Sequence, residues 1–295
     1  MSMTTVILLV LKASIILSVF ALGMKATFTE ATFLFRRPSL LLRALLAMGV
    51  LMPCIALVLA SVFELKPVVK IALIVISVSP IPPVLPNKAL KAGGTEDYTI
   101  GLLVAASVLS IVAIPIAMEL FARISGLPLG MGPGAIAVVM LTTILAPLLT
   151  GIAVRKIAEP FAERAAKPVA LIASVLLVVS VLPVLIGMGR AMVSLIGDGT
   201  LLSLSTFALA GFVIGHLLGG PDQQHRPVLA LATASRHPAV ALAIAQANFP
   251  AQKLAGGAVF LYLLVSAVMS ALYLKWVERR QPDAAPAETA KPVET

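Results

Sequence analysis

The residue types best suited to chemistry in this chain stand together at Arg236, His237 and Pro238. They interrupt an apolar run over residues 231–249, which reads LATASRHPAVALAIAQANF. A guanidinium can hold an anion through several N–H donors, an imidazole can carry a proton near neutral pH, and a proline breaks a helix. An arginine at the centre of a bilayer costs about 2.5–3.5 kcal/mol on insertion scales, so a charge within such a run marks a candidate site.

A second apolar run is interrupted by prolines. Residues 77–92 read SVSPIPPVLPNKALKA and contain Pro80, Pro82, Pro83 and Pro86. Each proline removes an N–H donor and clashes with the preceding turn, so the cluster predicts a true break in the helix. Broken helices at membrane depth are tolerated only where the freed backbone is buried in protein or lines a wet cavity. The polar residues in and beside the two breaks are candidates to bind a ligand or a coupling ion: Ser79, Asn87, Thr233, Ser235, Arg236 and His237.

The composition places both breaks in a membrane protein. Hydrophobic residues make up 60% of the 295 residues, charged residues make up 12%, and the mean hydropathy is +1.06. An ordinary soluble domain carries about 25% charged residues. The net charge of +9 is scattered between apolar runs, so it favours orientation in a bilayer over binding to nucleic acid. The single cysteine, Cys54, excludes an internal disulfide, and we expect it to be buried as a small apolar residue.

Nine apolar runs are long enough to cross a bilayer, at about 20 residues each. Their approximate limits are 5–24, 39–63, 67–86, 98–122, 134–154, 168–188, 200–219, 227–249 and 254–276. With the loop after the first run in the cytoplasm, fourteen Lys and Arg residues fall on the cytoplasmic side and five on the other. The positive-inside rule therefore predicts a plasma (inner) membrane protein with its N-terminus outside and its C-terminus inside. We expect residues 281–295 to form a disordered cytoplasmic tail.

The two breaks occupy related positions, in the third and eighth predicted spans, which run in opposite directions. We expect one membrane transporter domain over residues 1–280, built from inverted repeats at about 5–122 and 134–277, the first of which has lost a leading helix. Interrupted helices at matching positions of two repeats point to the binding site of a secondary transporter. Ser107 and Ser110 of the fourth span could line the same cavity, although bonding to their own helix is the commoner arrangement. His216 and His225 fall near the predicted cytoplasmic face, where we expect solvated or interfacial positions.

The order of these features resembles the bile acid:sodium symporter family. The pairs Gly23-Met24, Arg37-Pro38 and Met52-Pro53 match that family's opening core segment, and AVALAIAQANFP after the second break is similar to its second crossover. The resemblance covers residues 10 to 277. It implies an all-α polytopic membrane protein with nine or ten spans and two broken crossover helices. It also implies a core domain of spans 2, 3, 4, 7, 8 and 9, a panel domain of spans 1, 5 and 6, and a substrate held between them.

The departures from the family pattern concern sodium. Sodium-coupled members carry Glu-x-Gly-x-Gln-Asn in the second crossover, where the glutamate and glutamine supply oxygen ligands to two sodium ions. The matching residues here, 232–237, read ATASRH, so the carboxylate is missing and Arg236 replaces the glutamine. A further family glutamine corresponds to Met48. The first crossover's Pro-Gly-Gly-Thr and Ser-Asn correspond to residues 80–83 and to the region of Pro86 and Asn87.

Physical chemistry also disfavours sodium at these positions. All thirteen acidic residues lie in loops, at span ends or in the tail, so no carboxylate reaches the middle of the membrane. A cation 4 Å from Arg236 would be repelled by about 4 kcal/mol at an effective dielectric near 20. The arginine either takes the place of the bound cation by holding carbonyls freed by the breaks, pairs with an anionic substrate, or is satisfied in a static break. His237 is either a proton relay or a hydrogen-bonded structural histidine.

These features predict a secondary active or facilitative transporter that moves a small organic anion by alternating access. Its expected partners are the lipid bilayer and that anion; sodium is a doubtful partner, and no cofactor, resident metal or nucleic acid is expected. A sodium-coupled symporter with rearranged ligands is the alternative. An intramembrane enzyme or a sensor is more remote, because His237 alone offers acid–base chemistry and no soluble signalling domain is evident.

Overall fold

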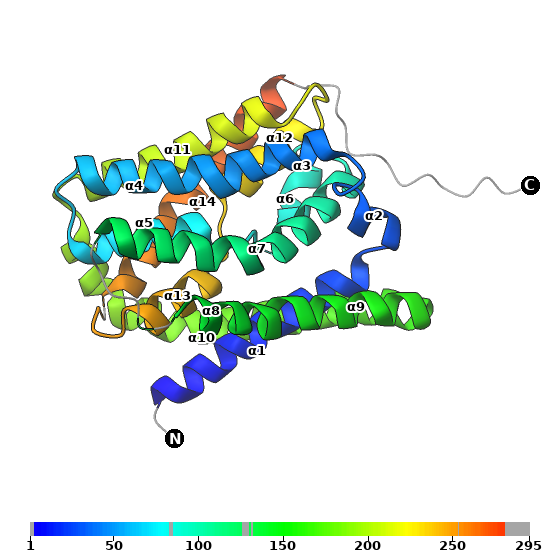
Figure 1. Cartoon of the computed structure of the whole chain (residues 1–295), viewed down its shortest axis with the longest axis horizontal. Coiled ribbons are helices and arrows are strands. Elements are labelled where there is room, and N and C mark those ends of the chain that lie inside the picture. Colours follow the sequence, from blue (N-terminus) through cyan, green and yellow to red (C-terminus); the bar gives the residue numbers. More distant parts are fainter. Residues whose placement is uncertain (1–2, 83–84, 126–129, 131, 253, 281–295) are drawn as a thin grey trace, which may run out of the picture.

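The computed structural model describes residues 3–82, 85–125, 130, 132–252 and 254–280, and this part of the chain is helical without strands (Figure 1). The helices, with two π-helical segments named η, are α1 (Met3–Lys25), α2 (Phe28–Thr32), α3 (Pro38–Leu45), η1 (Leu46–Leu51), α4 (Met52–Val62), α5 (Pro67–Val78), α6 (Leu85–Lys91), α7 (Glu96–Ser125), α8 (Pro133–Met140), η2 (Leu141–Leu145), α9 (Ala146–Ile157), α10 (Glu159–Leu195), α11 (Thr200–Leu218), α12 (His225–Ala234), α13 (Pro238–Asn248) and α14 (Ala255–Arg280).

Seven segments of the described chain are long and apolar enough to cross a membrane. They begin at Pro38, Glu96, Gly134, Glu159, Thr200, His225 and Ala255, and α5 is a shorter apolar helix. The prediction of an all-α protein that passes through the membrane several times is therefore confirmed. The count of nine spans also needs α1 and the α5–α6 pair, and it stays a prediction.

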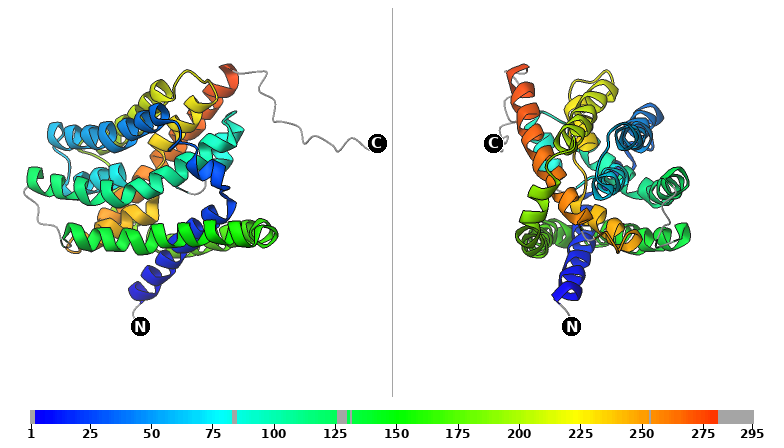
Figure 2. Two further views of the ribbon diagram at one scale, coloured as in Figure 1. Left: turned by 45° about the vertical axis from the view of Figure 1, so that its right-hand side comes forward. Right: turned by 90° about the vertical axis from the view of Figure 1, so that its left-hand side faces the viewer.

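Two groups of helices pack mainly within themselves (Figures 1 and 2). In the first group α1 packs along α9 and α10, and the Ser14 hydroxyl of α1 donates to the Ala173 carbonyl of α10 at 2.8 Å. A Cβ added at Gly23 of α1 or at Gly151 of α9 would lie within 3.0 Å of the other helix's backbone. The second group contains α4, α5, α7 and α11 to α14, and there Gly215 of α11 meets the backbone of α12 in the same way.

Both π-helical segments precede a proline. Pro53 follows η1 and Pro147 follows η2. Because a proline lacks an N–H and its ring clashes with the carbonyl four residues earlier, a widened turn relieves the conflict. In η1 the Met52 N–H donates to Ala47 and not to Met48. Since Pro53 has no N–H to give, the Met48 carbonyl loses both donors that a helical or π turn would supply.

The two predicted breaks are present. Helix α5 ends at Val78 and α6 begins at Leu85, while α12 ends at Ala234 and α13 begins at Pro238. Pro80 and Pro82 lie inside the first break, Pro86 lies in the first turn of α6, and Pro83 falls outside the described residues. Pro238 occupies the first turn of α13, where its fixed φ suits a helix start.

Two sequence expectations are wrong. Cys54 is exposed and not buried, because it shares a face of α4 with Val58 and Val62, whose side chains are 57% and 71% exposed. His225 is buried and not solvated, since its ring stacks on Tyr98 of α7 with centroids 4.1 Å apart. The expected tail at 281–295 falls outside the described residues.

Candidate binding site at the crossing of two interrupted helices

The two breaks meet through hydrogen bonds. The backbone N–H of His237 donates to the Pro80 carbonyl at 2.9 Å. Beside it, Nη1 of Arg236 donates to the Ser79 carbonyl at 3.0 Å. Both acceptors are free because the first break ends the helix that would have used them. The second break therefore supplies donors to the carbonyls of the first.

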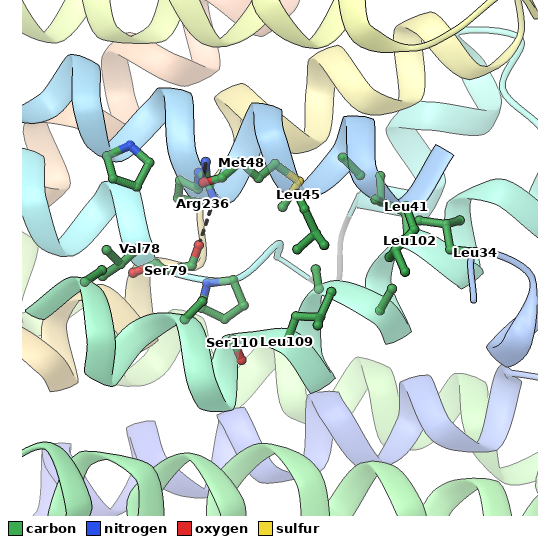
Figure 3. A pocket seen from close by; sticks show the side chains of 18 residues that line it. Leu34, Leu41, Leu45, Met48, Val78, Ser79, Leu102, Leu109, Ser110 and Arg236 are labelled. Atoms are coloured by element: carbon green, nitrogen blue, oxygen red, sulfur yellow. Dashed lines mark hydrogen bonds between the residues drawn. The ribbon is translucent and has the colours of Figure 1, made fainter. Parts of the chain in front are cut away.

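Arg236 also reaches a third span. Its Nη2 faces the Met48 carbonyl in η1 at 3.5 Å, a longer contact than the bond to Ser79. This carbonyl is the one that the π turn and Pro53 leave without a helical donor. Figure 3 shows the guanidinium between the two acceptors. With 3% of the residue exposed, Arg236 is a buried cation that joins η1 to both breaks.

The charge of Arg236 is balanced by dipoles. The described residues contain no ion pair between this arginine and a carboxylate. Instead the guanidinium lies against Ser79 at the carboxyl end of α5, where the helix dipole is negative. Arg236 also lies two residues after the carboxyl end of α12, which is a second negative dipole end. A cation is therefore favourable at this crossing even without an acidic partner.

Arg236 lines a cavity of about 60 Å³ between α3–η1–α4 and α7 (Figure 3). The walls are mostly apolar, with Leu41 and Leu45 on one side and Leu102 and Leu109 on the other. Nε of Arg236 has no hydrogen-bond partner. A cavity of this size has room for a few water molecules, which could use the remaining donors of the guanidinium.

His237 faces a different cavity, which measures about 10 Å³. Its walls include Ser18 of α1 and Ser107 of α7. The histidine is 3% exposed, and both of its ring nitrogens lack a hydrogen-bond partner. The pocket lies between the α1 group of helices and the interrupted ones, so a ligand moving along that boundary would meet His237 and not Arg236.

The candidate residues therefore do not converge on one point. Ser79 and Ser110 line the cavity of Arg236, whereas Ser107 lines that of His237. The Ser79, Ser110 and Thr233 hydroxyls each donate to a carbonyl of their own helix. Ser235 is buried and its hydroxyl has no partner. Asn87 lies in α6, and its side chain is outside the described part of the chain.

Two residues of α14 that were not among the sequence-predicted candidates also lie at this crossing. The Tyr262 hydroxyl donates to the Ala234 carbonyl at 2.6 Å, and the Ser266 hydroxyl donates to the same atom at 3.1 Å. They complete the carboxyl end of α12, whose carbonyls the break leaves free. A tyrosine and a serine four residues apart on one face of an apolar helix are the signal that could have found them.

The described residues contain no group of three or more His, Cys, Asp or Glu that could hold a metal ion.

The Sodium Bile acid symporter family model matches residues 13–195. The chain belongs to this family. Members are transporters, so it is a membrane transporter and not an enzyme. The match contains the first break and η1 but ends before Arg236, so the family assignment does not depend on the arginine. No curated protein matches the chain.

Proposed function

We propose that this protein moves a small organic anion across the membrane by alternating access, without sodium at the family's usual sites. The observation that carries the proposal is Arg236, which is buried and bonded to carbonyls of two other spans. In sodium-coupled members, as the resemblance implies, a bound cation and its ligands occupy this crossing. Here the protein supplies the cation itself.

A permanent cation at the crossing changes what the site can bind. A sodium ion there would need the Ser79 and Met48 carbonyls that already accept from Arg236, and it would meet like charge. The first turn of α13, with its positive dipole end, begins at the same break. An anion is therefore the favoured ligand, in keeping with half-helix N-termini that face anionic groups in other transporters.

The moving parts would be the two groups of helices. We assign α1, α8–η2–α9 and α10 to a panel domain and the other spans to a core domain, in nine crossings with the N-terminus outside. The inverted repeats at about 5–122 and 134–277, within a domain at 1–280, belong to this proposal. The boundary beside His237 is then the substrate path, and rotation of one domain against the other would open it to each side in turn.

Uptake into proteoliposomes tests the proposal. A panel of radiolabelled organic acids, including short hydroxy acids, keto acids and a bile acid, is offered with an inward gradient of sodium, potassium or choline. We expect uptake of at least one anion at the same rate in all three salts. The matched variant is His237→Ala, which should lower uptake while the protein still reconstitutes.

The sodium-coupled symporter with rearranged ligands remains the second candidate, because the family itself favours it. Uptake that rises tenfold or more with the sodium gradient would support that candidate and overturn the arginine proposal. Absence of anion uptake in every salt, from protein that is folded and inserted, would overturn both.

A further inference from the structure

A third cavity lies where the proposed panel and core meet, between α1, α8–η2 and α13. Its volume is about 350 Å³, compared with about 60 Å³ beside Arg236 and about 10 Å³ beside His237. Ligand pockets typically measure roughly 300–1,000 Å³. Of these three cavities, this one alone has the size to hold a small organic molecule in the described conformation.

The cavity has a positive lining. Lys12 of α1 is its charged residue, and Gln246 of α13 and Thr143 of η2 are its other polar side chains. Lys12 is exposed, and it stands about 14 Å along α1 from Met3 at 1.5 Å per residue. The Thr143 hydroxyl already donates to Val139, so it can only accept. An ammonium and an amide with free donors suit a carboxylate.

Two apolar residues separate this cavity from the pocket of His237. Ile15 of α1 and Val240 of α13 line both of them and are 4% and 3% exposed. One comes from each proposed domain. A movement of α1 away from α13 would part this pair and join the two cavities, whereas in the described arrangement the two side chains stand between them.

We propose that the Lys12 cavity is a waiting site for a small carboxylate on its way to His237, with Ile15 and Val240 as the gate between them. Its role in transport rests on the proposed function, but its charge and its water access do not. Lys12 attracts the carboxylate, Gln246 donates a further hydrogen bond, and the gate admits the anion when the domains move.

Single-cysteine labelling tests the charge of the cavity. The background is Cys54→Ser, which removes the chain's single and exposed cysteine. Gln246→Cys is then labelled in nanodiscs, where both faces are accessible, with an anionic and a cationic methanethiosulfonate reagent. We expect the anionic-to-cationic rate ratio to fall on the order of 3–10-fold when Lys12→Gln is added. Lys12→Arg, the matched control, should preserve the ratio.

Two results would overturn the waiting site. One is a rate ratio that does not change on Lys12→Gln, which would mean that the lysine serves only to reach the membrane surface. The other is a Gln246→Cys protein whose thiol does not react with either reagent, which would mean that the cavity is closed to water. Neither depends on uptake, so a failure of the proposed transport function is recognised separately.

The gate is tested with a thiol on the side of it that faces the pocket of His237. Ser107→Cys, in the same background, places a thiol in the pocket of His237. We expect slow labelling that becomes about tenfold faster when Val240→Ala opens the gate. Val139 lines the Lys12 cavity but not the pocket of His237. The control variant Val139→Ala should therefore leave the labelling rate of Ser107→Cys unchanged. Equal rates in the Val240→Ala and Val139→Ala proteins would refute the gate.

Discussion

The two breaks differ in what their backbones offer. Between α5 and α6 the chain is proline-rich, so it has few N–H donors and presents the carbonyls of Ser79 and Pro80. Between α12 and α13 the break is three residues long and presents donors, namely the Arg236 guanidinium and the His237 N–H. One break therefore supplies acceptors and the other supplies donors, and the two bind each other directly. Two similar breaks, both rich in carbonyls, would instead need a bound ion between them.

The carboxyl ends of the two interrupted helices are completed in different ways. At α5 the Ser79 carbonyl is satisfied by a charged side chain from the other break. At α12 the Ala234 carbonyl is satisfied by two neutral hydroxyls from α14. Hydrogen bonds to charged groups contribute more than neutral ones, so the first arrangement should be the more costly to disturb.

The largest effect should follow from removing the charged donor. Arg236→Met leaves the Ser79 and Met48 carbonyls buried without a donor, at roughly 1–3 kcal/mol each, offset in part because a buried charge is also removed. We expect the unfolding temperature in detergent to fall on the order of 5–10 °C. Arg236→Lys should lower the unfolding temperature less, since a lysine keeps the positive charge although it lacks the several N–H donors of the guanidinium.

The matched control for this change is Arg190→Met, which removes an arginine from an exposed position of α10. It should shift the unfolding temperature by no more than about 1 °C. Equal shifts for Arg236→Met and Arg190→Met would show that the two breaks do not depend on the arginine.

Two substitutions make the second break resemble that of a sodium-coupled member. Arg236→Gln combined with Ala232→Glu restores a carboxylate and an amide at the matching positions. We expect the double variant to be stabilised by sodium chloride relative to choline chloride, by about 2.7 kcal/mol when sodium is at 100 times its dissociation constant. The wild-type protein should show no such difference.

Ala232→Glu alone is the control for the double variant, because its carboxylate would pair with Arg236 and leave no vacancy for the ion. It should not respond to sodium. A double variant that folds and yet unfolds at the same temperature in both salts would contradict the match between residues 232–237 and the family's sodium ligands.

The smallest effect should come from the neutral caps of α12. Tyr262→Phe or Ser266→Ala leaves the Ala234 carbonyl with one donor, so each should cost less than about 1 kcal/mol. The double variant leaves none and should cost about 2 kcal/mol, more than the sum of the two. Thermal unfolding measures all three, with Ser270→Ala as the control, since the buried Ser270 hydroxyl has no partner. Additive losses would contradict the shared cap.

The sequence predicts the two breaks because proline and arginine are expensive within an apolar helix. Most predicted spans begin and end within a few residues of the observed helices, but 168–188 is shorter than α10 by nine residues at its start and seven at its end, and α2 is not predicted. The sequence does not predict η1, since a single Pro53 is compatible with a kink, a π turn or a helix start. The position of the Met48 carbonyl, and hence the second acceptor of Arg236, depends on that choice.

The division of the candidate residues into two cavities follows from backbone geometry. Ser235 and His237 have extended backbones, and successive side chains of an extended segment point in opposite directions. Arg236 and His237 therefore face different sides. Ser107 and Ser110 differ by about 60° around α7, enough for the crossing chain to lie between them. Grouping all of these residues by sequence proximity misses this separation.

The glycine contacts have a mechanical consequence. Where Gly23 meets Gly151 and where Gly215 meets α12, backbone touches backbone, and neither pair of helices can slide without a steric collision. On the boundary between the groups, Ile15 and Val240 line the cavities on both sides of them with side chains and not with backbone. The smallest residues of this transporter therefore make rigid contacts inside each group of helices, whereas at Ile15 and Val240 the boundary between the groups is formed by side chains.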